Sequence, residues 1–364
     1  MKPHSDVEEP GYVEPASGSK RSKGCPTDVQ EHAPSYRQSP QYWYPDGSVI
    51  VIAGSMGFKL YRARLNIYCG YFAERARTGE DLVVGACEHG DSEEEDSSRV
   101  EEHTTTSCAN APGLTQVRID DLSSTDFTRF LDVLETPQLE PKPLPDSHIA
   151  ASLLRAATRL DCQIVRTKAT RAILAAWPDG LPRPSAPLRP FQDAIDAITL
   201  ARACGMPEVR RPAFYALLRD PAFWTALAAD RRAIALPEDD LLRLHEARHT
   251  LQITWRVFVL KMPGEGRADL GSVCKKIDVP MGGPPRTCQS AAKDARACWR
   301  SLIIDSDMWE KGAVDPICCM LDEKNVRGLE YVWCSECMRS ARYKWFMTRR
   351  RWWDMLNRLF GLPD

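Results

Sequence analysis

The chain has 364 residues, of which 43% are hydrophobic, and its 48 lysines and arginines nearly balance 50 aspartates and glutamates. This composition can fill the cores of two or three domains, and a net charge of -2 excludes binding of nucleic acid or anionic membranes through whole-chain charge alone. The N-terminal residues lack the apolar segment of a secretory signal, and no apolar run approaches about 20 residues. We therefore expect a soluble intracellular protein, cytoplasmic or nuclear, without membrane contact.

Two segments are expected to be disordered. Residues 1–40 are rich in proline, serine, glutamate and lysine and show no hydrophobic period, which predicts a disordered tail. Residues 79–113 also lose periodicity, and the stretch EHGDSEEEDSSRVEEHTTTS carries eight acids around one arginine. We predict that this second segment is a solvated acidic insertion.

The ordered chain is expected to begin at about residue 43 with a β-hairpin. Residues 48–53 are a β-branched run, and a glycine-containing turn separates them from an alternating strand at 58–61. A helix should follow from about Ala63, because apolar residues recur there at intervals of three and four. These residues are Leu65, Tyr68, Cys69 and Phe72.

Beyond the insertion the pattern predicts one strand and then a series of helices. The strand covers 114–119, and Ser123 and its neighbours offer N-caps for the next helix. A proline-rich stretch at 179–190 is typical of a linker. Apart from the helix that begins near Ser123, the predicted helices are 148–162, 163–177, 191–205, 206–220 and 237–260.

Residues 46–76, DGSVIVIAGSMGFKLYRARLNIYCGYFAERA, resemble the opening of a BTB/POZ domain of the divergent type expanded in mushroom-forming fungi. That family begins with an Asp-Gly turn and an apolar strand, then a hairpin strand and a helix. The segment LLRAATRLDCQIVRTKATRAIL is similar to its closing helix pair, and weaker similarity continues to the C-terminus. Tyr61 stands where the family usually has histidine, and Cys69 where it usually has serine.

The resemblance implies an α/β (α+β) fold, with a small sheet and flanking helices in a domain at 43–178. A helical extension at 191–262 and a Cys/Trp-rich region at 263–364 would follow. It also implies a non-enzymatic scaffold or adaptor that binds proteins, with a homodimer and a ubiquitin-ligase substrate adaptor both left open. The hairpin and first helix form the interaction surface in this family, which here points to Tyr61, Leu65, Tyr68 and Phe72.

The motif His-Glu-x-x-His at 245–249 raises the alternative of a zinc metalloprotease. A helix would place His245 and His249 on one side, with Glu246 beside a metal-bound water. However, the extended form of the motif needs a third histidine six residues later, and Trp255 stands there. We favour an ordinary amphipathic helix, whose inward stripe is Leu241, Leu244, Ala247 and Leu251.

Seven of the 13 cysteines lie at or beyond Cys274. Cys334 and Cys337 form a Cys-x-x-Cys motif, and further cysteines precede it. Two interpretations stay open: buried apolar thiols, which we favour, or a structural zinc as the one cofactor. The candidate ligands of that zinc are Cys298, Cys318, Cys334 and Cys337.

The C-terminal segment interleaves basic and aromatic residues. This composition suits either a transcription regulator that binds DNA through the arginines at 349–351 or a helix docked by its aromatic face. We favour docking and expect no nucleic-acid partner, because the apolar residues recur at helical intervals. They are Trp345, Phe346, Trp352, Trp353, Leu356 and Leu359.

Overall fold

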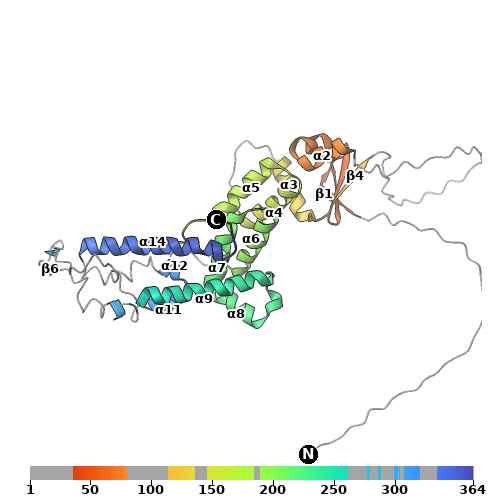
Figure 1. Ribbon diagram of the computed structural model, residues 1–364. Coiled ribbons are helices and arrows are strands. Elements are labelled where there is room, and N and C mark those ends of the chain that lie inside the picture. Colours follow the sequence, from red (N-terminus) through yellow and green to blue (C-terminus); the bar gives the residue numbers. More distant parts are fainter. Residues whose placement is uncertain are drawn as a thin grey trace, which may run out of the picture.

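The computed structural model is an α+β protein in which a four-stranded sheet at one end leads into a mainly helical remainder (Figure 1). No helix of the described residues has the length and hydropathy needed to cross a bilayer. The structure describes residues 36–79, 114–135, 146–183, 189–260, 299–301, 303, 307–319 and 334–363, and the backbone of 277–278 and 286–287. The expected tail at 1–35 and the acidic insertion at 80–113 lie outside these residues.

The sheet is mixed, with strand order β1-β3-β2-β4. β2 is antiparallel to β3, while β1 runs parallel to β3 and β4 parallel to β2. All five residues of β2 are buried, which explains its continuous β-branched run. The strands are β1 (Arg37–Trp43), β2 (Val49–Ala53), β3 (Met56–Leu60) and β4 (Thr115–Ile119).

The predicted hairpin is present as β2 and β3, but the strand before it was missed. β1 begins at Arg37, inside the segment expected to be a disordered tail. Its two buried residues are Ser39 and Tyr42, and the Tyr42 hydroxyl donates to Asp132 Oδ1 at 2.5 Å. Parallel pairing with β3 supplies the hydrogen-bond partners of β1. A short polar strand that depends on a later partner has no strong local signal.

The single helix predicted after the hairpin is two helices, α1 (Arg62–Tyr68) and α2 (Gly70–Thr78). The break follows from close packing of Gly70 on a later turn. Gly70 N–H donates to the Asp161 carbonyl at 3.1 Å, and a Cβ at Gly70 would lie 2.2 Å from Asp161 Oδ2. Only glycine allows this approach without displacing the Asp161 side chain.

Three further helices complete the first half: α3 (Ser124–Glu135), α4 (Ser147–Arg159) and α5 (Gln163–Ala176). Ser123 Oγ accepts from Asp126 N–H at 3.0 Å, as the predicted N-cap should. Phe58 of β3 meets Phe127 of α3 edge to face, with ring centroids 4.8 Å apart. These three predicted helices are therefore confirmed, and α3 packs on the sheet.

The second half begins with α6 (Phe191–Ala203), α7 (Pro207–Arg219), α8 (Pro221–Ala229), a 3-10 turn η1 (Arg231–Ala233) and α9 (Glu238–Leu260). Sequence analysis missed α8. Its start has a clear signature, because Asp220 Oδ1 accepts from Ala222 N–H at 2.9 Å and Pro221 occupies the first helical position. An N-cap followed by proline was therefore an available signal.

The C-terminal region contributes α11 (Met308–Val314), α12 (Pro316–Cys319) and α14 (Ser335–Leu359), with the two-residue strands β5 (Ile277–Asp278) and β6 (Arg286–Thr287). In Figure 1, α14 lies beside α9 and runs in the opposite direction. Trp352 meets Phe258 with ring centroids 5.4 Å apart, and Trp299 meets Trp345 at 6.1 Å. The helical extension and the C-terminal region therefore share one core.

Candidate functional site

Tyr61 anchors an aromatic surface at the start of α1. It is the N-cap residue of α1, directly after β3, and is 37% exposed. Its hydroxyl donates to Asp46 Oδ1 at 2.7 Å, and its ring stacks on Tyr44 with centroids 5.1 Å apart. The hydrogen bond to Asp46 raises the pKa of Tyr61, because the protonated hydroxyl is the form that donates to this carboxylate. The turn before β2 therefore holds this ring in place.

Ile67 and Tyr68 extend the surface along α1. Ile67 is 76% exposed and Tyr68 39% exposed. Tyr61 and Tyr68 are about two helical turns apart and so lie on the same side of α1. Grouped apolar side chains with this exposure are typical of contact surfaces. We refer to Tyr44, Tyr61, Ile67 and Tyr68 as the α1 surface.

Two residues predicted for the interaction surface are core residues instead. Leu65 is 2% exposed and Phe72 is 4% exposed, and both belong to the hydrophobic core. Their spacing at three and four residues is the pattern of an inward face, so the signal for the helix also marked them as buried. Sequence analysis missed Ile67, which is apolar but falls outside that inward pattern. An apolar residue outside the inward stripe was the available signal.

Cys69, at the serine position of the resembling family, lies in a buried thiol pair. The Cys69 thiol is hydrogen-bonded to Cys162, which lowers the pKa of Cys162 and raises that of Cys69. The two residues precede α2 and α5, and both are buried. Cysteine thus fills the serine position while keeping a hydrogen bond inside the core.

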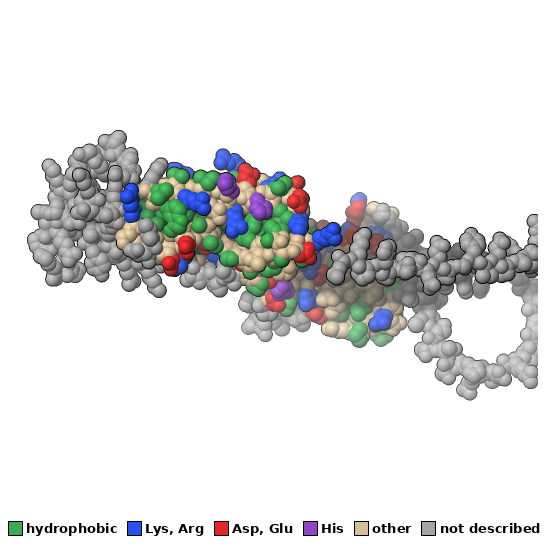
Figure 2. All heavy atoms as spheres, turned by 90° about the horizontal axis from the view of Figure 1, so that it is seen from below, with side chains coloured by type: hydrophobic (Ala, Val, Ile, Leu, Met, Phe, Trp, Pro, Cys, Tyr) green, Lys and Arg blue, Asp and Glu red, His purple; other side chains and the backbone are tan. Residues whose placement is uncertain are grey.

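The His-Glu-x-x-His motif lies on the exposed side of α9. His245, Glu246 and His249 are exposed, and the predicted inward stripe of Leu241, Leu244, Ala247 and Leu251 is confirmed as buried. Histidine side chains are visible on the face shown in Figure 2. His245 packs edge to face against Trp224 of α8, with ring centroids 4.9 Å apart. Among the described residues no three metal-ligating side chains come together.

The four cysteines proposed for zinc do not form one set. Cys334 is the residue that precedes α14, at its N-cap position. Cys318 lies near Arg349, whose Nε donates to the Ile317 carbonyl at 2.7 Å. Cys334 and Arg349 are separated along the helix by about 22 Å, given a rise of 1.5 Å per residue. Zinc ligands lie about 2.3 Å from the metal, so Cys318 cannot share an ion with Cys334 and Cys337. Cys298 lies outside the described residues, and metal binding by the other two cysteines stays a prediction.

The C-terminal helix is docked, as favoured from the sequence. Trp345, Trp352, Trp353 and Leu356 of α14 are buried, although Phe346 is 42% exposed. Of the three arginines proposed for DNA binding, Arg349 is 4% exposed and donates to the carbonyls of Ile317 and Pro182. Arg349 is therefore a structural residue and not part of a free basic face.

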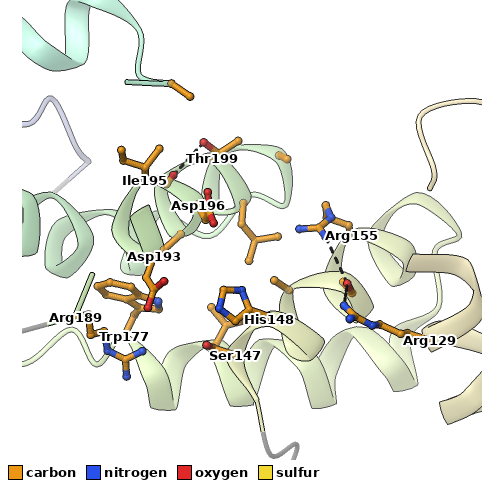
Figure 3. A pocket seen from close by; sticks show the side chains of 17 residues that line it. Arg129, Ser147, His148, Arg155, Trp177, Arg189, Asp193, Ile195, Asp196 and Thr199 are labelled. Carbon is orange, nitrogen blue, oxygen red and sulfur yellow. Dashed lines mark hydrogen bonds between the residues drawn. The ribbon is translucent and has the colours of Figure 1, made fainter. Parts of the chain in front are cut away.

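A groove of about 500 Å³ lies between α4 and α5 on one side and α6 on the other (Figure 3). Side chains from α3, α4, α5 and α6 line it, together with Arg189 of the linker and Ala235 before α9. Sequence analysis did not predict this site, because its residues are scattered along the chain. Its polar residues are Arg129, Ser147, His148, Ser152, Arg155, Arg189, Asp193, Asp196 and Thr199.

Asp126 orients Arg155, which lines one end of the groove. Its carboxylate accepts two hydrogen bonds from the Arg155 guanidinium, each of 2.9 Å. Burial acts to raise the pKa of Asp126, but hydrogen bonds from Arg155 and Ser152 outweigh it, and the pKa is lowered. We expect Asp126→Asn to reduce the free energy of unfolding at neutral pH by about 1–3 kcal/mol. Urea denaturation would measure this loss.

The effect of Asp126→Asn should depend on pH. A carboxylate whose pKa is lower in the folded state stabilises the fold above its unfolded-state pKa, and this contribution disappears as the pH falls through the folded-state pKa. The difference between wild type and variant should therefore shrink below about pH 4. Asp239→Asn, at an exposed site of α9, is the control. A difference that is constant with pH would contradict this assignment.

No protein-family model and no curated protein matches the chain. The functional argument therefore depends on the geometry of the α1 surface, the groove and the resemblance in residues 46–76. Ile67 of the α1 surface is the most exposed large hydrophobic residue among the described residues.

Proposed function

We propose that this chain is a non-enzymatic protein–protein interaction module of the BTB/POZ type, which self-associates through the α1 surface and serves as a scaffold or adaptor. The single observation that carries the proposal is the exposure of Ile67 and Tyr68 on α1 and of Tyr61 at its N-cap, next to Leu65 as the one buried residue of this helix. Ile67 alone is 76% exposed. Burial of such an apolar side chain by a protein partner lowers the free energy of the complex.

The order of elements supports the BTB/POZ assignment. The resembling family begins with an apolar strand, a hairpin strand and a helix, and here β2, β3 and α1 follow in that order. Its closing helix pair corresponds to α4 and α5, which pack against each other. In that family the hairpin and first helix are used for pairing and partner docking, and the α1 surface occupies the same place.

The departures from the family pattern fit a changed contact surface within the same fold. Tyr61 replaces the usual histidine and is held by Asp46 and Tyr44, so a rigid aromatic ring faces the partner. Cys69 replaces serine in the core and does not reach the surface. A fixed aromatic residue loses little conformational entropy on binding, which favours it at interfaces.

Self-association tests the proposal directly. We expect the full chain to form dimers in analytical ultracentrifugation, and the pair of substitutions Ile67→Glu and Tyr68→Glu to weaken dimerisation by at least about tenfold, since two charges would lose their hydration in the interface. The matched control is Leu242→Glu on α9, where an apolar residue is also 61% exposed. Circular dichroism would verify that all variants fold.

Three results would oppose the proposal. A chain that stays monomeric across the accessible concentrations would exclude self-association. A dimer that persists unchanged in the Ile67→Glu and Tyr68→Glu variant would place the interface elsewhere. An equal loss in the Leu242→Glu variant would show that the effect comes from added charge and not from the α1 surface.

A further inference from the structure

We propose that the groove between α4, α5 and α6 is a binding site for small amphipathic carboxylic acids. It contains no residue of the α1 surface, so this site does not depend on self-association. Its volume of about 500 Å³ falls within the range of about 300–1,000 Å³ that is typical of small-molecule sites. It also lies where the sheet-bearing half meets the helical half, and such junctions are common places for ligands.

Two arginines lie at one end of the groove. Arg129 of α3 and Arg155 of α4 both donate to Ser152 Oγ, at 2.6 and 3.5 Å (Figure 3). Ser152 is 2% exposed, so its hydroxyl is a buried acceptor that orients both guanidinium groups. Asp126 pairs with Arg155. In the described part of the chain Arg129 has no carboxylate partner. The carboxylates of Asp126 and Asp196 both act on Arg155, whereas the Arg129 guanidinium is left to bind a ligand carboxylate.

The floor of the groove is apolar. Small and branched aliphatic side chains from α4, α5 and α6 form it, so the body of a ligand would lie against hydrocarbon. Trp177 at the other end is 6% exposed, and the guanidinium of Arg189 lies over its ring at 5.1 Å from the centroid. The apolar residues of the lining are Ala151, Ile173, Trp177, Ile195, Ala197, Leu200, Ala203 and Ala235.

Two aspartates of α6 limit the charge that the ligand can carry. Asp193 and Asp196 lie along the wall that faces α4 and α5 (Figure 3). They would repel a second anionic group, which disfavours dicarboxylates and the repeated charges of nucleic acid. They can accept hydrogen bonds from a hydroxyl or an amine at the far end of a ligand. The groove therefore fits a molecule with one carboxylate, an apolar body and at most a donor group at its other end.

The test uses naphthylacetate as the probe and naphthylethanol as its uncharged counterpart, each titrated into the full chain by isothermal titration calorimetry. We expect the acid to bind at least about tenfold more tightly than the alcohol, because only the acid makes charge-assisted hydrogen bonds with Arg129. The substitution Arg129→Gln should remove this preference. Arg171→Gln, at an exposed arginine of α5 outside the groove, should leave it unchanged.

A second variant tests the groove without changing its charge. Ala151→Leu adds bulk to the floor and should weaken both probes by about tenfold or more, while the thermal unfolding midpoint verifies that the chain still folds. Equal affinity for the acid and the alcohol would overturn the proposal. So would acid binding that survives Arg129→Gln or falls equally with Arg171→Gln. Absence of binding by both probes to the wild-type chain would also overturn it.

Discussion

Replacement of Asp315 by alanine is expected to lower the free energy of unfolding by about 3–5 kcal/mol, because it would leave a buried arginine without its counter-ion. Asp315 Oδ1 accepts from the Tyr215 hydroxyl at 2.5 Å and from Cys318 N–H at 3.0 Å, and Oδ2 accepts from Arg219 at 3.2 Å. The side chain of Arg219 is 11% exposed and Tyr215 is 2% exposed. Both groups are therefore largely shielded from solvent and would lose a hydrogen-bond acceptor.

Urea denaturation followed by circular dichroism would measure this loss. The control is Asp354→Ala, since that carboxylate is 62% exposed and should matter by no more than about 0.5 kcal/mol. Asp315→Asn keeps an acceptor and should fall between the two. We refer to Asp315, Tyr215, Arg219 and Cys318 as the Asp315 cluster. If Asp315→Ala costs no more than Asp354→Ala, then the Asp315 cluster does not join α7 to the C-terminal region.

Arg349, next to the Asp315 cluster, holds part of the linker in place. Arg349 of α14 donates to the carbonyls of Ile317 and Pro182, and burial lowers its pKa from the ordinary arginine value. Pro182 belongs to the stretch between the two halves of the chain, and Arg189 of the same stretch lines the groove. Contacts of the C-terminal helix therefore fix the linker that borders the proposed ligand site.

The second large effect is expected from Trp255→Ala. Trp255 of α9 is fully buried, its Nε1–H donates to the Trp309 carbonyl at 3.2 Å, and its ring meets Trp352 of α14. A Cβ at Gly312 would lie 2.0 Å from the Trp255 ring, so α11 also packs closely against it. Loss of this side chain leaves a large cavity and should cost about 3–5 kcal/mol.

The same denaturation experiment, with Trp309→Ala as the matched control, tests this prediction. Trp309 is 37% exposed, so its truncation should have a much smaller effect. Gly312→Val would place a larger side chain against the Trp255 ring and should destabilise the chain through overpacking. Similar losses for Trp255→Ala and Trp309→Ala would show that α9 does not form the centre of the helical half.

The two interpretations of the C-terminal region differed because they depended on different kinds of information. The docked helix followed from the helical spacing of Trp345, Trp352 and Leu356, which local sequence shows. The zinc set depended on bringing Cys318 next to Cys334, and sequence spacing does not determine such an approach. In the structure Cys334 lies at the N-terminus of α14, whereas Cys318 of α12 lies near Arg349, about 22 Å further along α14.

The sequence by itself determined the local elements of this protein. The β-branched run of β2, the N-cap Ser123, and the inward stripe of α9 all follow from backbone geometry and side-chain periodicity within a few residues. Those signals predicted most helices, the hairpin and the α+β class. The proposed surface of Tyr61, Leu65, Tyr68 and Phe72 came instead from the resemblance to the BTB/POZ family. Tyr61 and Tyr68 are exposed, whereas Leu65 and Phe72 are buried.

Only the tertiary structure decided which residues form sites. The pairing of β1 with β3, the meeting of Arg129 with Ser152 and Arg155, and the contact of Asp315 with Tyr215 join residues that are far apart in the chain. Such contacts are selected by the packing of whole helices and by the charge of the final neighbours, and no local pattern encodes them. The groove and the Asp315 cluster therefore exist only in the folded chain.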